Sequence, residues 1–178
     1  MDLAHSLFLK AKFMSFVDTV ISRRSIRRYE KREIPADALD KILEAGRQAP
    51  SAANRQPFHI IVITSQELKK ELSTGLFNRF IQDSAVTVVG CANNSEILTA
   101  RWAVVDASIA LQNMVIEAWA LGIGSCWIGD FREDSLKQLL EIPDKWKVVA
   151  LVSLGYPAEQ PQPKRKKTIE ELFSYNKF

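Results

Sequence analysis

The segment 99–121 constrains the fold most, because apolar side chains face nearly every direction around its expected helix. From Arg101 to Leu121, the polar side chains are Arg101, Asp106, Ser108, Gln112, Asn113 and Glu117. A helix of about 20 residues that is apolar all round must be buried on all sides. Such a helix lies either at the centre of one subunit's core or between two subunits. A chain of 178 residues rarely has room for it alone, so we expect a homodimer.

Composition indicates one globular domain over 16–178, preceded by an N-terminal extension over 1–15. Hydrophobic residues make up 47% of the chain and charged residues 25%, which excludes a disordered or low-complexity protein. No apolar stretch reaches the roughly 20 residues of a membrane helix. The two cysteines, Cys91 and Cys126, form no C-x-x-C pair and no disulfide framework, so we expect a cytoplasmic protein.

Hydrophobic periodicity alternates between helix and strand along the chain. Helices are expected near 16–21, 38–45, 65–72, 99–121, 134–140 and 168–173. Strands are expected near 58–64, 85–91, 122–129 and 147–154. Thr64 with Glu67, and Thr168 with Glu171, have the spacing of capping boxes. The interleaved elements favour a sheet covered by helices on both faces.

Positive charge is concentrated in two short segments of a chain whose net charge is only +3. One segment runs from Arg23 to Arg32 and the other from Lys164 to Lys167, so the remainder is acidic. Two focused cationic spots suit a small anion better than the continuous basic face of a nucleic-acid-binding protein. The alternatives are a solvated surface, or a module that grips RNA or an anionic partner.

Several kinds of catalytic site are excluded by the residues present. The two histidines, His5 and His59, are too few and too far apart for a histidine metal site or a Ser-His-Asp triad. No G-x-x-x-x-G-K-[ST] phosphate loop occurs. The Gly122-x-Gly124 pair follows a helix instead of opening one, so a Rossmann dinucleotide site is not expected.

Three motifs, in this order and spacing, resemble the nitroreductase family of FMN-dependent flavoproteins, over about 16–173. They are Arg23-Arg24-Ser25-Ile26-Arg27-Arg28-Tyr29, Ala49-Pro50-Ser51 to Asn54-Arg55-Gln56-Pro57, and Leu121-Gly122-Ile123-Gly124 to Ile128-Gly129. The resemblance implies an α+β fold, a three-layer α/β/α sandwich with a central, mostly antiparallel sheet. It also implies an intertwined homodimer with two FMN sites at the subunit interface.

By position, Arg23, Arg24 and Ser25 match the family residues that hold FMN. Lys164 and Lys166 match the basic pair that neutralises its phosphate. Several cations and arginine forks suit a phosphate dianion.

Arg27 matches the cation that the family places near the N1 and O2 edge of the flavin ring, where it would stabilise the anionic reduced flavin. We name no other catalytic residue. Ser51 and Asn54 match a loop that reaches the flavin from the partner subunit. The alternative is that this loop is only a capped turn between two prolines.

Trp127, Ile128, Gly129 and Asp130 match the strand segment that packs against the flavin ring. Glycine there allows backbone amides to approach N5. Larger members use an asparagine to read the pyrimidine, and either Asn78 or Gln82 takes that role here.

The resemblance implies an oxidoreductase in which NADH or NADPH reduces flavin N5 by hydride transfer and is replaced by a nitroaromatic or quinone. Donor and acceptor then share one pocket, so ping-pong kinetics are expected. Dehalogenation, dehydrogenation or flavin breakdown on the same fold are the alternatives. No metal, nucleic acid or membrane is expected as a partner.

Overall fold

The computed structural model describes residues 15–95 and 100–178. The helices are α2 (Phe16–Ser22), α3 (Ala36–Arg47), α4 (Gln66–Leu72), α5 (Ala100–Ala120), α6 (Glu133–Leu139) and α7 (Ile169–Leu172), with 3-10 turns η1 (Ala52–Asn54) and η2 (Arg79–Asp83). The strands are β1 (Phe58–Ile63), β2 (Val86–Asn93), β3 (Gly124–Ile128) and β4 (Trp146–Gly155). The extension expected over 1–15 lies outside the described residues except for Ser15, which caps α2.

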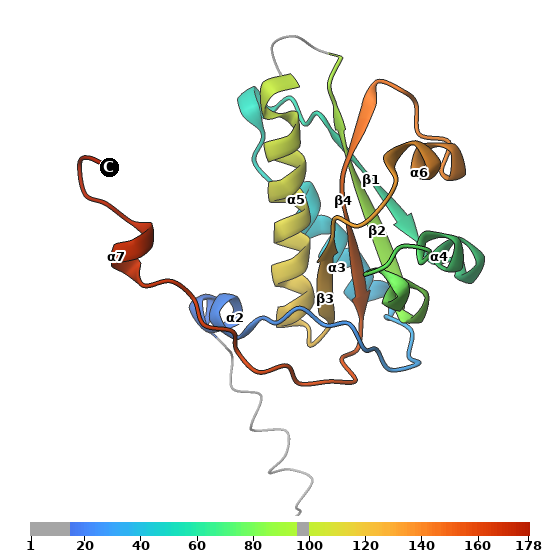
Figure 1. Cartoon of the computed structure of the whole chain (residues 1–178), viewed down its shortest axis with the longest axis horizontal. Coiled ribbons are helices and arrows are strands. Elements are labelled where there is room, and N and C mark those ends of the chain that lie inside the picture. Colours follow the sequence, from blue (N-terminus) through green and yellow to red (C-terminus); the bar gives the residue numbers. More distant parts are fainter. Residues whose placement is uncertain (1–14, 96–99) are drawn as a thin grey trace, which may run out of the picture.

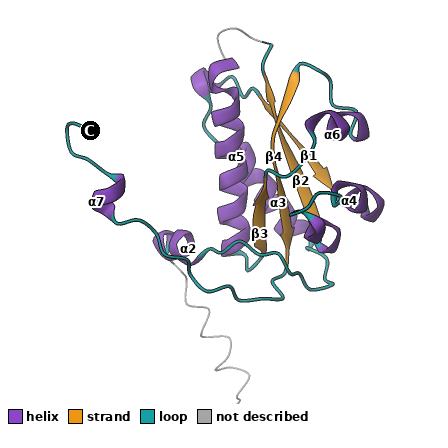
Figure 2. Cartoon of the chain, in the orientation of Figure 1, coloured by secondary structure: helices purple, strands orange, loops and turns teal. Residues whose placement is uncertain are grey.

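The strands form one sheet in the order β1-β2-β4-β3, and every neighbouring pair is antiparallel. Alternate side chains face opposite sides of a sheet. Val88 and Val152 accordingly pack toward α3 and α5, while Val89 and Leu151 pack toward α4 and α6. Helices therefore cover both faces (Figures 1 and 2), which confirms the expected α+β sandwich around an antiparallel sheet.

Helix α5 lies very close to the sheet because Gly90 has no side chain. A Cβ at Gly90 would stand 2.6 Å from Leu111 Cδ1. Trp102 and Val105, on the other side of α5, remain 46% and 43% exposed. The expected burial of this helix on all sides is therefore not achieved within one chain, and one of its sides is open.

The first residue of α4 was predicted one position too early. Ser65, not Thr64, caps this helix, because the Ser65 hydroxyl accepts a hydrogen bond from Leu68 N at 3.3 Å. The capping box of Thr168 and Glu171 at the start of α7 is confirmed in both directions.

Beyond Gly155 the chain runs along the foot of the molecule and out to α7, which stands away from the body (Figure 1). Large apolar side chains of α7 and of the residues after it are exposed, among them Ile169, Leu172, Phe173 and Tyr175. No helix within the described ranges has both the length and the apolar character needed to cross a lipid bilayer.

Candidate functional site

Residues 23–29, here called the arginine loop, lie along the edge of the sheet beside β3. Ile26 N donates to Ser125 O at 2.9 Å, and Ser25 forms a parallel bridge with Ser125. Ile26 is 1% exposed and packs against Gly124, where a Cβ would stand 2.6 Å from Ile26 Cγ1. Side chains alternate in direction along an extended segment. Burying Ile26 therefore turns its neighbours Ser25 and Arg27 away from the core.

The arginines of this loop have no carboxylate partner within salt-bridge distance in the described part of the chain. The three ion pairs found there involve other residues. The Arg24 guanidinium donates to two main-chain carbonyls, Ile21 O at 2.8 Å and Arg23 O at 2.9 Å, which leaves its charge uncompensated. Arg27 lies 6.0 Å from the centre of the Phe80 ring. The loop is thus a cluster of cations suited to an anion.

The strand that the arginine loop borders, β3, is followed by open backbone at Gly129. The side chains of Trp127 and Ile128 are used for packing: the Trp127 indole donates to Gln112 Oε1 at 3.1 Å, and Ile128 is buried in the core on the α4 and α6 side. Gly129 is exposed, and a Cβ built on it would meet no atom within 4 Å. A flat ring system could approach the main chain at this point, so the residues present fit FMN by charge and by space.

Cys126 lies close enough to the arginine loop that Arg23 and Arg27 affect its ionisation. Burial nevertheless raises the pKa of this thiol, and the two arginines only partly oppose that effect. The thiol is therefore protonated at neutral pH and has no thiolate nucleophile to offer.

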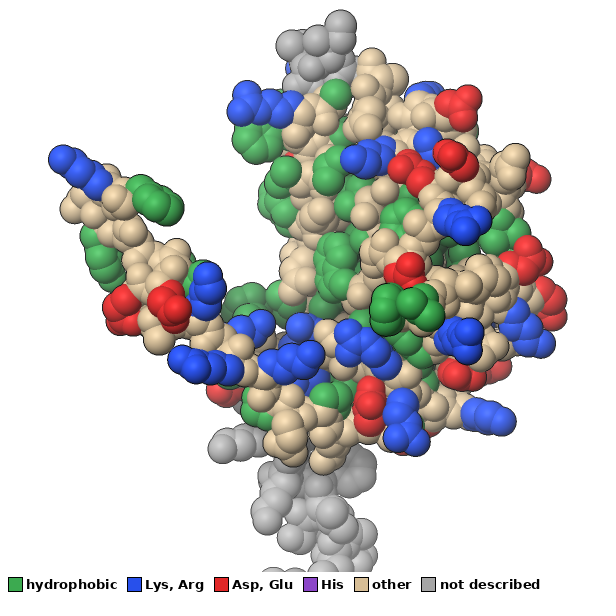
Figure 3. Space-filling view, viewed as in Figure 1, with side chains coloured by type: hydrophobic (Ala, Val, Ile, Leu, Met, Phe, Trp, Pro, Cys, Tyr) green, Lys and Arg blue, Asp and Glu red, His purple; other side chains and the backbone are tan. Residues whose placement is uncertain are grey.

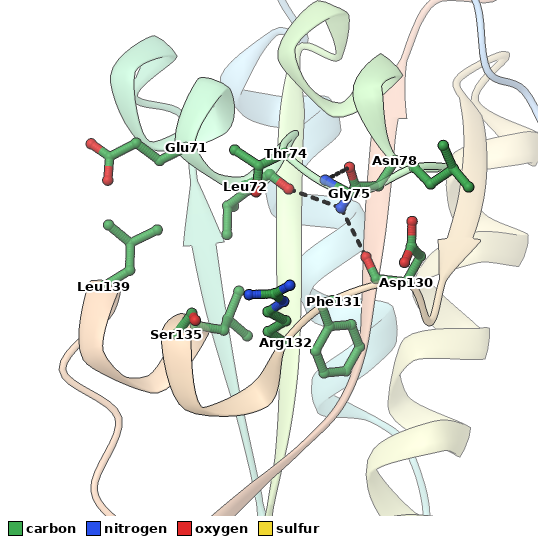
Figure 4. A pocket seen from close by; sticks show the side chains of 12 residues that line it. Glu71, Leu72, Thr74, Gly75, Asn78, Asp130, Phe131, Arg132, Ser135 and Leu139 are labelled. Atoms are coloured by element: carbon green, nitrogen blue, oxygen red, sulfur yellow. Dashed lines mark hydrogen bonds between the residues drawn. The ribbon is translucent and has the colours of Figure 1, made fainter.

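Asn78 and Asp130 tie the turn before η2 to the segment after β3 (Figure 4). Asn78 is 2% exposed, and its side-chain amide donates to Leu72 O and Asp130 O and accepts from Gly75 N. One carboxylate oxygen of Asp130 accepts from Phe77 N at 2.7 Å. Asn78 and Asp130 line a cavity of about 560 Å³ together with Phe131 and Arg132.

Of the two candidates for reading the pyrimidine, Asn78 already has both ends of its amide hydrogen-bonded within the chain. Gln82 is exposed on η2, and its main-chain carbonyl accepts from the Gln66 side chain. Asn78 therefore shapes the turn beside Asp130, and Gln82 keeps its side chain available.

Ser51 and Asn54 lie in a strained loop at the opposite end of α5 from the arginine loop (Figure 1). Ser51 Oγ accepts from Gln56 N at 2.9 Å, so the hydroxyl does cap the turn. Ala53, Asn54 and Gln56 all have positive φ angles, between 51° and 55°. Strain of this kind persists only where surrounding contacts enforce it, and it is often found at functional sites.

Lys164 and Lys166 are exposed on the segment that leads to α7. This segment starts beside the arginine loop, where Ala158 N donates to Arg28 O at 2.9 Å. Figure 3 shows Lys and Arg side chains in a row across the foot of the molecule, from the C-terminal segment to the body. The segment that leads to Lys164–Lys167 therefore leaves the body of the molecule beside the arginine loop.

Sequence reasoning missed two acidic residues of the site. Asp106, on α5, accepts from Ala52 N at 3.2 Å and so holds the loop of Ser51 and Asn54. Glu159 accepts from the main chain of the arginine loop. Both act on residues far away in the sequence, so no local pattern could have indicated them.

Comparison with known proteins agrees with this geometry. Residues 20–92 and 77–156 match the sequence model of the nitroreductase family. A protein of Archaeoglobus fulgidus, provisionally named NADH dehydrogenase/NAD(P)H nitroreductase, is 38% identical over 148 residues, which cover 79% of this chain and 84% of that protein.

Two solved structures extend the likeness to the fold. A nitroreductase family protein from Clostridium novyi NT is 32% identical, with a TM-score of 0.76, over 85% of this chain and 89% of that one. An FMN-dependent nitroreductase from Clostridium difficile is 28% identical, with a TM-score of 0.79, over 90% of this chain and 98% of that one.

Proposed function

The chain belongs to the nitroreductase family, and from this premise we propose that it holds FMN at the arginine loop and passes electrons from NAD(P)H to a nitroaromatic or quinone. FMN, when bound, supplies the redox centre that accepts hydride and releases electrons. The protein's own residues bind, orient and electrostatically tune it. A relative of similar size is named as FMN-dependent, which supports the cofactor assignment.

The observation that carries this proposal is the uncompensated charge of the arginine loop along β3, the strand that is followed by the open backbone of Gly129. Arg23 and Arg24 are half-buried, so an anion bound to them is partly shielded from water and bound more strongly. Ser25 adds a hydroxyl donor between them and β3. Lys164 and Lys166 complete the phosphate site from the neighbouring C-terminal segment.

Arg27 is the residue that tunes the cofactor. Its neighbour Ile26 is buried and anchors the loop, while the Arg27 side chain is exposed and lies beside Phe80. A fixed positive charge next to the ring favours the state with added electrons. We assign proton delivery to solvent and name no general acid.

The site also requires a second copy of the chain. The loop of Ser51 and Asn54 is held at Asp106, whereas the residue before the arginine loop, Ser22, accepts from the Trp119 indole at 2.9 Å. The two anchors, Asp106 and Trp119, lie thirteen positions apart on one helix, about 20 Å at 1.5 Å per residue. One flavin cannot bridge both ends within one chain, whereas a partner with α5 reversed would bring them together.

Exposed apolar side chains on α5 and on the C-terminal segment that carries α7 are available for contact in such a dimer. An apolar groove of about 370 Å³ runs along α5 and is lined by residues that include Val104, Val105 and Ile109. The exposed apolar residues of α7 would find cover on a partner. Burial of such surfaces is the main driving force for permanent subunit association.

Steady-state kinetics test the reaction. With NADPH or NADH varied at several concentrations of a nitroaromatic or of a quinone, double-reciprocal plots are expected to be parallel, because one pocket serves both substrates in turn. The double variant Arg23→Ala, Arg24→Ala is expected to lose FMN and activity. Arg47→Ala, at an exposed arginine that pairs with Glu44 on α3, is the matched control and keeps both. Intersecting plots would contradict the shared pocket.

A further inference from the structure

Glu159 holds two consecutive main-chain amides of the arginine loop. Its Oε1 accepts from Arg27 N at 2.6 Å and from Arg28 N at 3.1 Å, across more than 130 positions in the sequence. Hydrogen bonds from amides to a carboxylate are roughly twice as strong as those between neutral groups. The contact therefore fixes the loop backbone on the side away from β3, whereas Ser125 O fixes it at Ile26 N.

This carboxylate leaves the cationic groups beside it free. No ion pair joins Glu159 to an arginine side chain among the residues that the structure describes, although its charge acts on both Tyr29 and Cys126 in the same region. It thus satisfies the backbone of Arg27 and Arg28 without neutralising their guanidinium groups by direct contact.

Glu159 is also the point from which the C-terminal segment departs. Ala158 N donates to Arg28 O at 2.9 Å, and Pro157 forms a bridge with Tyr29. Lys164 follows Glu159 by five positions, and an extended chain of that length spans at most about 17 Å. Holding Glu159 on the loop therefore keeps Lys164 within reach of the same anion.

We propose that Glu159 is a positioning residue for the phosphate site: it latches the C-terminal segment to the arginine loop and so presents both sets of cations to one anion. The inference rests on the proposed function, because the anion is taken to be the FMN phosphate. In this arrangement a negatively charged residue strengthens the binding of a negatively charged ligand, whereas repulsion between the two like charges alone would weaken it.

The test compares FMN affinity, by fluorescence quenching, in Glu159→Ala, Glu159→Gln and Glu30→Ala. Loss of the latch in Glu159→Ala is expected to weaken FMN binding roughly tenfold. Glu159→Gln keeps an acceptor oxygen but makes the weaker hydrogen bonds of a neutral group, so its FMN affinity is expected to lie between those of Glu159→Ala and the wild type. Glu30 lines the same pocket as Glu159, but its carboxylate has no hydrogen bond in the described structure. Glu30→Ala therefore removes a nearby negative charge without breaking a contact to the arginine loop, and its FMN binding is expected not to be weakened. Equal or tighter binding by Glu159→Ala would overturn the proposal.

A second readout does not depend on the flavin. In the FMN-free protein, amide hydrogen exchange at Arg27 and Arg28 is expected to accelerate in Glu159→Ala and to accelerate less in Glu159→Gln, which keeps an acceptor oxygen. Unchanged exchange in Glu159→Ala would refute the latch. If the wild type bound no FMN, the proposed function would fail, while the exchange experiment would still decide whether the latch exists.

Discussion

Ile26 places the charged residues of the arginine loop although it carries no charge itself. It is almost completely buried against Gly124, and its main-chain amide bonds to Ser125 O. The motif around it is recognisable in the sequence from its arginines. Its register against β3 depends on a glycine about one hundred positions later, where only a missing side chain gives Ile26 its space.

Gly124→Ala is expected to destabilise the protein and to weaken FMN binding together. The added methyl group would stand 2.6 Å from Ile26 Cγ1, and overpacking of this kind typically costs about 1–3 kcal/mol. Gly129→Ala is the matched control, because its methyl group meets nothing within 4 Å, and it should change stability by no more than about 0.5 kcal/mol. Urea unfolding of the FMN-free proteins measures the difference, and equal midpoints for the two variants would contradict the account.

The roles of other single residues, such as Ser51 and Asn78, could not be predicted from the sequence alone. For Ser51 the sequence allows two roles, a flavin contact or a cap of the turn. The structure shows that its hydroxyl does cap the turn, by accepting from Gln56 N. Asn78 was one of two candidates for the pyrimidine, and its burial and three hydrogen bonds within the chain could not be read from its neighbours. Such assignments depend on partners that are brought together only by folding.

At the scale of elements, periodicity predicted nearly all of the secondary structure because apolar spacing is a local property. One helical boundary differs from the prediction: Ser65, and not Thr64, caps α4, since two adjacent hydroxyl residues offer the same signal. The short turns η1 and η2 were not predicted. The positive φ angles at Ala53 and Gln56 occur without glycine, so the residue types themselves gave no indication of them.

The buried strand β2 gives the protein a specific response to alkaline pH. Burial, aided by Glu133, raises the pKa of the Cys91 thiol from 9.0 to about 11. Below about pH 9 both the folded and the unfolded states keep the proton. Between about 9 and 11 the unfolded chain loses it first, so the free energy of unfolding falls as pH rises.

Denaturant unfolding at a series of pH values checks this response. The wild type should lose stability between about pH 9 and 11, and Cys91→Ala should lose less over the same interval, because only the wild type has this thiol to ionise. Cys126 and Tyr29, whose pKa values are also raised chiefly by burial, remain in both proteins and contribute equally. Identical slopes for the two proteins would show that Cys91 does not contribute.

At the scale of the whole molecule, the apolar helix 99–121 indicated more surface than one chain covers, and α5 does keep Trp102 and Val105 exposed. The sequence predicts this excess of apolar surface because it follows from the number and the spacing of apolar residues along the helix. How a partner would lie against the exposed side of α5 depends on the path of residues 156–178. It also depends on the distance between the arginine loop and the loop of Ser51 and Asn54. Neither can be read from a linear pattern.

A mixed-dimer experiment tests the shared site. Arg23→Ala, Arg24→Ala impairs the loop of one chain, and Ser51→Ala, Asn54→Ala impairs the other contributing loop. If each site combines the two loops from different chains, mixing the two inactive variants restores one intact site in each mixed dimer, or about a quarter of wild-type activity overall. No recovery, in a mixture shown by tagged pull-down to contain mixed dimers, would place both loops of a site in the same chain.

A flavin held at the arginine loop and reduced by NAD(P)H would colour the protein. The most direct measurement is the visible spectrum of the freshly purified, unsupplemented protein, before and after anaerobic addition of NADH or NADPH. We expect oxidised flavin bands that bleach with at least one of the two nucleotides. Bands that persist would indicate another donor or another flavin reaction. A colourless protein that does not take up added FMN would contradict the assignment, and steeply salt-dependent binding of RNA would then explain the basic segments.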